Sequence, residues 1–452
     1  MISMKRESGM ERVGIVICNY NKADMVCECI QTVLESKYTD YRIYVVDNAS
    51  SDDSVQRVRV RFDGQVTLLV NEKNLGGSGG FNTGIRRALE TGHEYVWCLD
   101  NDVLVDEGAL GVLVEFLDAH PDCGMAGSRV DHMEAPEYVQ QYGIIVDFDE
   151  FCVEAKYLNH LEDGTMPDVV YSDAVAACSV LVRSSLIREI GLMPEDNFLY
   201  WDDTEWGWRC NLAGYRVASC GKSIVLHAMG AKKETVNTFP TYYAWRNWVD
   251  FFARYTPEEK LERMYVSFLD ALFDMQYEGL YNGTENRAKT TMAAFDDALH
   301  GIRGEAGEDR IFELEPKKDR LAELIAAQKK ARGEIGRIVI EENGFAAQAQ
   351  LLKEQLHALC PQAEFVDKPD GKSLCFAMCQ FLFTQGDVSL QKYYVDCQGN
   401  LLATEEDALL IINYAYSKRA FRYTMLPLFR RSVQKLRKTA ADRRTEITER
   451  DK

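Results

Sequence analysis

The sequence has no long apolar run, no apolar leader and no C-x-x-C pair of cysteines. No eighteen consecutive residues are apolar, so we expect no membrane-spanning helix. The first residues, MISMKRESGM, lack the apolar stretch of a secretion signal, so we expect no export. The thirteen cysteines include no C-x-x-C pair with the spacing of a zinc site. Abundant, unpaired cysteines favour a cytoplasmic location.

The chain also has a shortage of positive charge. Its formal net charge of −19 argues against nucleic acid as a partner, because a phosphate backbone would be repelled. The apolar fraction of 46% and charged fraction of 27% are those of a globular protein. A length of 452 residues is enough for two or three domains. The basic residues gather at the end, where the segment from Lys418 onward has twelve Lys or Arg and four Asp or Glu.

Short apolar runs alternate with helical patterns through the first hundred residues. The runs Val13–Cys18, Tyr41–Val46, Val66–Val70 and Tyr95–Leu99 predict buried strands. Helices are expected over Ala23–Ser36 and Gly84–Thr91. This alternation predicts an α/β fold with a mostly parallel sheet. Ligands of such sheets bind at the carboxyl ends of the strands.

The rest of the chain divides into three further stretches. Residues 106–255 have a mixed pattern and complete a first region, 11–255. Residues 256–335 are rich in Ala, Glu, Lys and Arg and predict a helical connector. Residues 336–452 predict a small α+β region, with a strand–helix–strand unit, a hairpin over Tyr393–Leu402 and a basic amphipathic tail.

Asp100-Asn101-Asp102 follows directly on the predicted strand YVWCL. Two carboxylates at positions i and i+2 can approach one hard cation, and Mg²⁺ and Mn²⁺ prefer oxygen ligands that they share with substrate phosphates. A D-x-D sequence is also common in ordinary loops. Its place at a strand end favours the metal interpretation.

The segment Asn74–Gly84, NLGGSGGFNTG, has four glycines in five residues before a predicted helix. Glycines allow a ligand to approach the backbone, and helix N-terminal amides favour an anion. No G-K-[ST] follows, so the segment is not a P-loop. A dinucleotide fingerprint would follow the first strand, where CNYN stands instead. A flexible loop without a ligand is the alternative.

Three further places carry candidate chemistry. Asp47 ends a predicted strand and could bind a base or ribose, or cap a helix. The segment WDDTEW at 201–206 sets three carboxylates among aromatic side chains, and burial could raise the pKa of one of them and make it a general base. Acids at a helix N-terminus are the alternative there. His227 follows a strand-like run and becomes a ligand only if the fold brings it to Asp102.

Taken in order, the segments VGIVICNYNK, VVDNASSD, NLGGSGGFNTG, CLDND, WDDTEWGWR and VLHAMG resemble the family-2 inverting glycosyltransferases of the GT-A fold. The likeness spans roughly residues 11–255. It implies an enzyme that uses a nucleotide diphosphate sugar and a divalent metal, Mn²⁺ or Mg²⁺. Asp100, Asp102 and His227 would bind the metal, and Asp203 stands at the position of the catalytic base.

The resemblance also assigns donor and acceptor residues. Asn19 and Asp47 would lie near the nucleoside. The remaining donor contacts would come from Asn74, Gly76, Gly77, Gly80, Asn82, Asp100 and Asn101. Acceptor contacts would come from Trp201, Asp202, Glu205 and Trp206.

The double-glycine segment with WDD looks most like galactofuranosyltransferases, with rhamnosyltransferases close behind. The expected role is synthesis of a bacterial cell-surface polysaccharide on a glycan or lipid-linked acceptor. Alternatives are a nucleotide-sugar-binding protein without catalysis and a nucleotidyltransferase, although the latter would need a basic, glycine-rich loop after the first strand. Residues 336–452 resemble no family that helps to choose the sugar.

The basic tail supports two interpretations. Met425, Leu426, Leu428, Phe429, Val433 and Leu436 could form one apolar face beside basic residues. Such a helix could lie on the inner face of a membrane, as a peripheral contact. It could equally pack on the body of the protein or on a second copy in a homo-oligomer.

Overall fold

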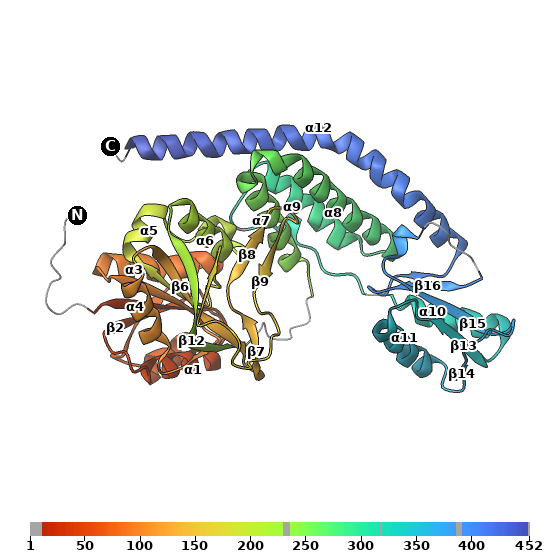
Figure 1. Cartoon of the computed structure of the whole chain (residues 1–452), viewed down its shortest axis with the longest axis horizontal. Helices are drawn as coiled ribbons and strands as arrows, with labels where there is room; N and C mark the ends of the chain where they lie inside the picture. The colour runs from red at the N-terminus through yellow and green to blue at the C-terminus, as the bar shows by residue number, and fades with distance from the viewer. Residues whose placement is uncertain (1–10, 229–235, 317, 386–390, 451–452) are drawn as a thin grey trace.

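Two sheets lie at opposite ends of the molecule with helices between them, as Figure 1 shows for the computed structural model. The structure describes residues 11–228, 236–316, 318–385 and 391–450. Helix α12 (Glu405–Arg450) starts beside the second sheet and runs back over the central helices toward the first sheet. No helix in these ranges is both long and apolar enough to cross a bilayer.

The N-terminal sheet has ten strands in the order β10-β12-β6-β11-β4-β1-β2-β3, with β5 beside β12 and β7 beside β6. The strands β3, β2, β1 and β4 are mutually parallel, and β11 is antiparallel to both β4 and β6. The predicted α/β fold is confirmed. The strands are β1 (Val13–Asn19), β2 (Tyr41–Asp47), β3 (Val66–Val70), β4 (Tyr95–Asp100), β5 (Val103–Val105), β6 (Cys123–His132), β7 (Ala135–Gln141), β10 (Val169–Ser172), β11 (Ser179–Arg183) and β12 (Arg216–His227).

Helices cover both faces of this sheet because its central strands are apolar on both sides. On β1, Ile15 and Ile17 pack in one core and Val16 packs in the other. The first face carries α1 (Ala23–Leu34), α2 (Ser54–Arg61) and α4 (Ala109–Ala119). The second carries α3 (Gly76–Thr91), α5 (Ser184–Ile190) and α6 (Asp202–Leu212). A separate hairpin pairs β8 (Ile144–Asp147) with β9 (Cys152–Ala155).

Helix α3 corrects one prediction. The sequence predicts a loop up to Gly84, but the helix already begins at Gly76. A Cβ at Gly80 would lie 2.4 Å from Cys18 Sγ, and one at Gly84 would lie 2.3 Å from Val16 Cγ1. The glycines therefore let the helix backbone lie directly on β1. This packing stabilises the helix despite the low helix propensity of glycine.

The central helices form an aromatic-rich bundle with α12. Its members are α7 (Phe239–Tyr255), α8 (Leu261–Asn282) and α9 (Glu285–Leu299). Of the six apolar residues predicted to form one face of the tail, five pack into this bundle. The sixth, Leu428, is 53% exposed. The apolar face of the tail is thus covered by the protein itself. This corrects the idea that this face meets a membrane.

The second sheet has five strands in the order β14-β13-β15-β16-β17. Its elements are α10 (Arg320–Arg332), β13 (Arg337–Glu341), α11 (Ala346–Leu359), β14 (Glu364–Phe365), β15 (Leu374–Cys379), β16 (Tyr393–Asp396) and β17 (Leu401–Leu402). The predicted strand–helix–strand unit and the hairpin are both present. Short 3-10 helices cover Glu195–Asn197, Glu258–Lys260, Glu308–Arg310 and Leu382–Thr384.

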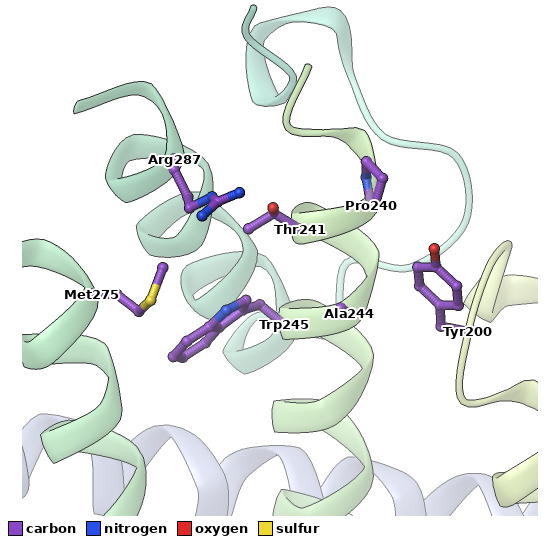
Figure 2. Close-up of a pocket in the computed structure, with 7 residues that line it drawn as sticks. All are labelled: Tyr200, Pro240, Thr241, Ala244, Trp245, Met275 and Arg287. Atoms are coloured by element: carbon purple, nitrogen blue, oxygen red, sulfur yellow. The ribbon is translucent and has the colours of Figure 1, made fainter. Parts of the chain in front are cut away.

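A pocket of about 430 Å³ opens where the central helices face the segment before α6 (Figure 2). It is lined by Tyr200, Pro240, Thr241, Ala244, Trp245, Met275 and Arg287.

Candidate active site

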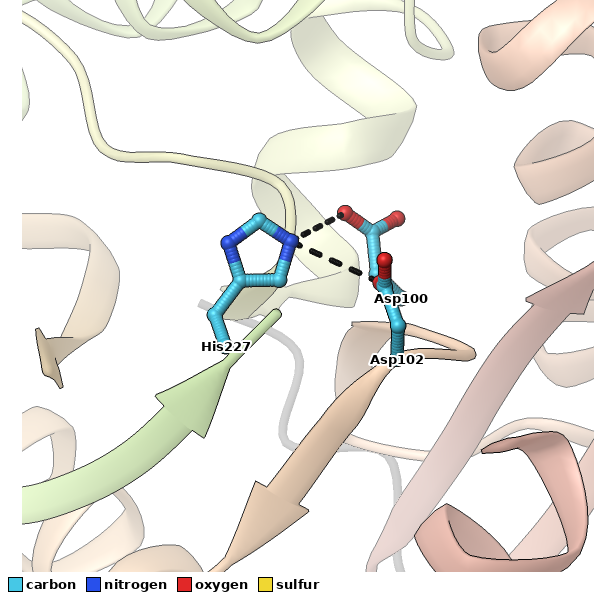
Figure 3. A group of neighbouring side chains, drawn as sticks. All are labelled: Asp100, Asp102 and His227. Atoms are coloured by element: carbon cyan, nitrogen blue, oxygen red, sulfur yellow. Dashed lines mark ion pairs between the residues drawn. The ribbon is translucent and has the colours of Figure 1, made fainter. Parts of the chain in front are cut away.

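Asp100, Asp102 and His227 come together at the carboxyl end of β4 (Figure 3). His227 Nε2 lies 3.5 Å from Asp102 Oδ1 and 3.9 Å from Asp100 Oδ2. One ligand atom from each residue lies within 4.8 Å of the others. Two carboxylates and one imidazole at this spacing form a donor set that suits a divalent cation such as Mn²⁺ or Mg²⁺.

Strand pairing explains how His227 reaches this place. Asp102 directly precedes β5, and β5 pairs antiparallel with the end of β12. The register sets Val103 opposite His227, and the amide of Ala228 donates to the carbonyl of Asp102 over 3.1 Å. The sequence predicts His227 to be a ligand only if the fold brings it to Asp102. The fold does bring the two residues together. Met229 and Gly230 of the same motif lie outside the described residues.

A hydrogen bond to Gln140 orients the imidazole. His227 Nδ1 lies 2.7 Å from Gln140 Oε1, which can only accept. With the shared proton on Nδ1, Nε2 is the ring atom that faces the two carboxylates and would bind a metal ion. Burial opposes protonation of the ring, but the hydrogen bond to Asp102 and the charges of Asp100 and Asp102 raise the pKa of His227. Metal-binding histidines commonly have such an outer partner, because it fixes the ring and its tautomer. The residues present thus fit a metal ion.

The charges of the cluster respond to burial and to one another. Burial, together with the charge of Asp102, raises the pKa of Asp100 to about 6. Burial opposes ionisation of Asp102 too, but His227 and Lys22 outweigh it and lower its pKa. Lys22 Nζ lies 2.5 Å from Asp102 Oδ2. A cation is therefore already held at this carboxylate.

Asp202 and Asp203 start helix α6 and face the same edge of the sheet. Oδ2 of Asp202 would lie 3.7 Å from a Cβ at Gly77. Burial, with the charge of Asp203, raises the pKa of Asp202 to about 7, and burial also raises the pKa of Asp203. The charge of Asp100 adds to the shift at Asp202. A group with a raised pKa can accept a proton near neutral pH.

The segment before α6 has a strained backbone. Phe198, Tyr200 and Trp201 have φ values of 65°, 62° and 66°, a region that non-glycine residues seldom occupy. Such strain persists where the surroundings hold it, and it gathers at functional sites. Asn247 donates to the carbonyls of Leu199 and Tyr200 over 2.8 and 3.0 Å.

Gly76 and Arg246 hold the same segment from two sides. A Cβ on Gly76 would lie 2.1 Å from the carbonyl oxygen of Phe198, so only glycine fits at φ +77°. The buried guanidinium of Arg246 donates to the carbonyl of Asn197 over 2.7 Å.

Glu205 belongs to a buried ionic network, which corrects its assignment to the acceptor. Its carboxylate pairs with Arg209 at 2.8 Å and with Arg303 at 3.0 Å, and it accepts from Tyr255. Burial opposes ionisation of Glu205, but the charge of Arg303, followed by that of Arg209, holds its pKa well below the usual range. Only 1% of Glu205 is exposed. The residue fixes α6 rather than binding a substrate.

Trp206 is also a correction. It lies in the core beneath the sheet with 1% exposure, and its indole donates to the carbonyl of Gly191 over 3.1 Å. Trp201 packs on Phe251 and Phe252 of α7 but is only partly buried. Trp201 and Asp202 therefore remain the acceptor candidates of the WDDTEW segment.

The residues expected near the nucleoside form a buried hydrogen-bonded chain. Asn19 Nδ2 donates to Asp47 Oδ1 over 3.1 Å, and Asn101 Nδ2 donates to Asn19 Oδ1 over 2.7 Å. This chain ties together the ends of β1, β2 and β4. It places Asp47 on the same sheet edge as the metal cluster.

The candidates of the glycine-rich segment have different positions. Asn74 Oδ1 accepts from the amide of Gly76 over 2.8 Å and so holds the turn that enters α3. Asn82 is fully buried and donates to the carbonyl of Met193. Gly80 packs on β1. Of these candidates, only Gly77 lies next to Asp202.

Sequence reasoning missed Lys22, Gln140, Arg246 and Arg303. Lys22 stands in the loop after β1 and could have been found there, because that loop borders the same sheet edge. The other three come from distant elements that only the tertiary structure brings to the site.

Comparisons with known proteins relate part of the chain to glycosyltransferases and polysaccharide synthases. Residues 14–187 match the sequence profile of Glycosyl transferase family 2. Poly-beta-1,6-N-acetyl-D-glucosamine synthase of Staphylococcus aureus (strain MSSA476) is 22% identical over 218 residues, which are 46% of this chain and 48% of that protein. The protein of the same name in Staphylococcus epidermidis is 26% identical over the same shares. The chain thus matches about half the length of these relatives.

Among solved structures, that of GalNAc-T7 with UDP, GalNAc and Mn²⁺ matches 56% of this chain and 50% of its own, at 14% identity and a TM-score of 0.45. The parallel strands β3, β2, β1 and β4 of the α/β sheet lie almost entirely within the residues that match the family profile. Residues 14–187 of this chain are thus similar to the glycosyltransferases of family 2.

Proposed function

We propose that this protein is an inverting, metal-dependent glycosyltransferase that moves a sugar from a nucleotide diphosphate sugar to a glycan or lipid-linked acceptor. The observation that carries the proposal is the meeting of Asp100, Asp102 and His227 with the raised-pKa pair Asp202 and Asp203 at one sheet edge. We assign residues 11–255 to the catalytic domain, 256–335 to a helical connector and 336–452 to a C-terminal region.

Asp203 acts as the general base in this proposal. Its carboxylate takes the proton of the acceptor hydroxyl while that oxygen bonds to the anomeric carbon. The bond from the anomeric carbon to the diphosphate breaks, and its electron pair leaves with the nucleotide. A divalent ion held by Asp100, Asp102 and His227 would neutralise the charge of that leaving group. A single displacement inverts the anomeric centre.

For the donor we favour a uridine or thymidine diphosphate sugar carrying galactofuranose or rhamnose, within bacterial cell-surface polysaccharide synthesis. This choice rests on the resemblance of NLGGSGGF and WDD to those branches of the family. The names of the Staphylococcus relatives refer to an N-acetylglucosamine polymer, so an N-acetylglucosamine donor is the main competitor.

Two other functions make different predictions. A nucleotide-sugar-binding protein without catalysis would bind the donor but never hydrolyse it. A nucleotidyltransferase would consume a nucleoside triphosphate and release diphosphate. The carboxylates and the imidazole of the site are all present, which favours transfer over binding alone.

Metal-dependent donor binding tests the proposal directly. With Mn²⁺, a true donor at about 100 times its Kd should raise stability by about 2.7 kcal/mol, or several degrees in Tm. EDTA or the variant Asp102→Asn should remove that shift, because one of three ligands is lost. A thermal-shift screen over uridine and thymidine diphosphate sugars, with Asp168→Asn as an exposed control, provides the measurement. Failure of every such donor to shift Tm or to be hydrolysed would contradict an enzyme of this class.

Activity should fall as the pH drops through about 7. Burial raises the pKa of Asp202 to about 7 and raises that of Asp203, so the pair holds a proton below that pH. A protonated carboxyl cannot act as a base, and kcat/KM for donor hydrolysis at saturating Mn²⁺ should decrease toward acid. Asp202→Asn removes the neighbouring charge and should move the inflection to lower pH. A flat profile from about pH 5.5 to 8 would rule out this pair as the base.

A further inference from the structure

The pocket beside Tyr200 has no role in the reaction described so far. Its residues come from four places: the strained segment before α6, and helices α7, α8 and α9. In Figure 2, Thr241 and Trp245 project from α7 toward Met275 of α8 and Arg287 of α9. A volume of about 430 Å³ is in the range of small-molecule sites.

Arg287 gives the pocket a positive charge. Its guanidinium is exposed and has no ion pair or hydrogen bond among the residues that the structure describes. Two other arginines of the central region are engaged: Arg254 pairs with Asp250 and Arg310 pairs with Asp297. The charge of Arg287 acts on Glu278, whose pKa is nevertheless raised, chiefly by burial. Arg287 is therefore available to an anion from outside.

Tyr200 and Trp245 supply aromatic surface to the same pocket. Tyr200 is 44% exposed although its backbone is held at φ 62° by the hydrogen bond from Asn247 to its carbonyl. Backbone strain of this kind gathers at active sites and ligand contacts. Aromatic faces offer the apolar surface on which the C–H side of a sugar ring can stack.

The pocket lies close to the proposed base along the chain. Asp203 is three residues after Tyr200, and consecutive Cα atoms are about 3.8 Å apart, so their Cα atoms are separated by at most about 11 Å. An acceptor of two or three sugar units can span from Asp203 to the pocket. In the proposed function the donor lies at the metal cluster and Gly77, where a Cβ on Gly77 would be 3.7 Å from Oδ2 of Asp202.

We propose that this pocket binds an anionic sugar unit of the acceptor, one or two units away from the hydroxyl that is attacked. Arg287 pairs with its carboxylate or phosphate, and Trp245 and Tyr200 hold its ring. The proposal rests on the proposed function, because it names the class of acceptor: a negatively charged glycan. A carboxylate and a phosphate share the chemistry that Arg287 recognises.

Binding of defined saccharides to the whole chain tests the proposal. The probes are trigalacturonate for the carboxylate, mannose 6-phosphate for the phosphate and maltotriose as the neutral control, each titrated by saturation-transfer NMR. We expect at least one acidic probe to bind tenfold or more tightly than maltotriose. The tighter acidic probe identifies the anion. Equal affinity for all three would overturn the proposal.

Variants on α9 and α7 locate the site. Arg287→Gln should weaken the acidic probe about ten- to hundredfold, as loss of a charged hydrogen bond predicts. Lys289→Ala, an exposed cation two residues further along α9, should leave binding unchanged. Trp245→Phe keeps the helix packing and should reduce the saturation transfer to the ring protons. Equal effects of the Arg287 and Lys289 variants would show general attraction to positive charge and would refute the pocket.

Donor binding separates the two proposals. If an acidic saccharide binds through Arg287 while no nucleotide diphosphate sugar binds with Mn²⁺, the pocket stands as a glycan site and the transferase proposal fails. If the donor binds and is hydrolysed while neutral and acidic saccharides bind alike, the transferase stands and the pocket proposal fails.

Discussion

Replacing Asp203 with Asn is expected to lower sugar transfer by about 10²- to 10⁴-fold, the usual contribution of a general base. Asparagine has the shape of the carboxylate but cannot take the proton of the acceptor hydroxyl. One oxygen of Asp203 accepts from the amide of Thr204 over 2.6 Å, and an amide oxygen can do the same, so α6 should start unchanged. Donor binding with Mn²⁺ should survive, because Asp100, Asp102 and His227 are untouched.

Rates of donor hydrolysis and the Mn²⁺-dependent thermal shift, measured on the same preparations, separate these two effects. Asp168→Asn is the matched control, because Asp168 is an exposed carboxylate whose pair with Lys222 lies at the surface. Wild-type rates in the Asp203 variant would remove this residue from the chemistry. Loss of both hydrolysis and the thermal shift would instead assign Asp203 to donor binding.

The sequence predicts most of the first sheet because its central strands are continuous apolar runs. Both faces of β1 are buried, as the 0% exposure of Val13, Val16 and Ile17 shows. A strand buried on both faces is a continuous apolar run, which is easy to find in a sequence. The ends of these apolar runs also locate the polar residues at the strand ends. Asp47 and Asp100 are found at the carboxyl edge because parallel strands end there together.

Tertiary contacts decide what the sequence pattern leaves open. His227 reaches Asp102 only through the antiparallel pairing of β5 with β12, for which no local pattern exists. The glycines of α3 indicate a loop by propensity, but close packing on β1 makes them helical. Glu205 and Trp206 closely follow the candidates Asp202 and Asp203 in the sequence, yet the helical period turns them toward the interior.

The C-terminal tail is a second place where the sequence pattern leaves the packing partner open. Periodicity correctly identifies the apolar face that includes Phe429 and Val433, but periodicity alone cannot name what covers it. Here α8 and its neighbours cover it, and Arg422 pairs with Asp270 of α8 at the edge of the contact. The central helices therefore link the C-terminal part of the chain to the first domain.

Arg303 extends this link to the candidate active site. The residue follows α9, outside the segment that matches the family profile, and only 10% of its side chain is exposed. It pairs with Glu205 of α6 and, at 3.3 Å, with Asp250 of α7. The helix that carries Asp203 is thus held in place by a residue of the helical region beyond the first sheet.

Arg303→Ala is expected to destabilise the protein by about 3–5 kcal/mol, because it leaves the buried carboxylates of Glu205 and Asp250 short of a counter-charge. Arg303→Lys restores the charge without the forked geometry and should recover part of the loss. Lys222→Ala, which breaks an exposed pair, should change stability by about 1 kcal/mol or less. Urea midpoints followed by tryptophan fluorescence measure all three. A loss in Arg303→Ala no larger than that in Lys222→Ala would show that Arg209 and Arg254 compensate Glu205 and Asp250 without it.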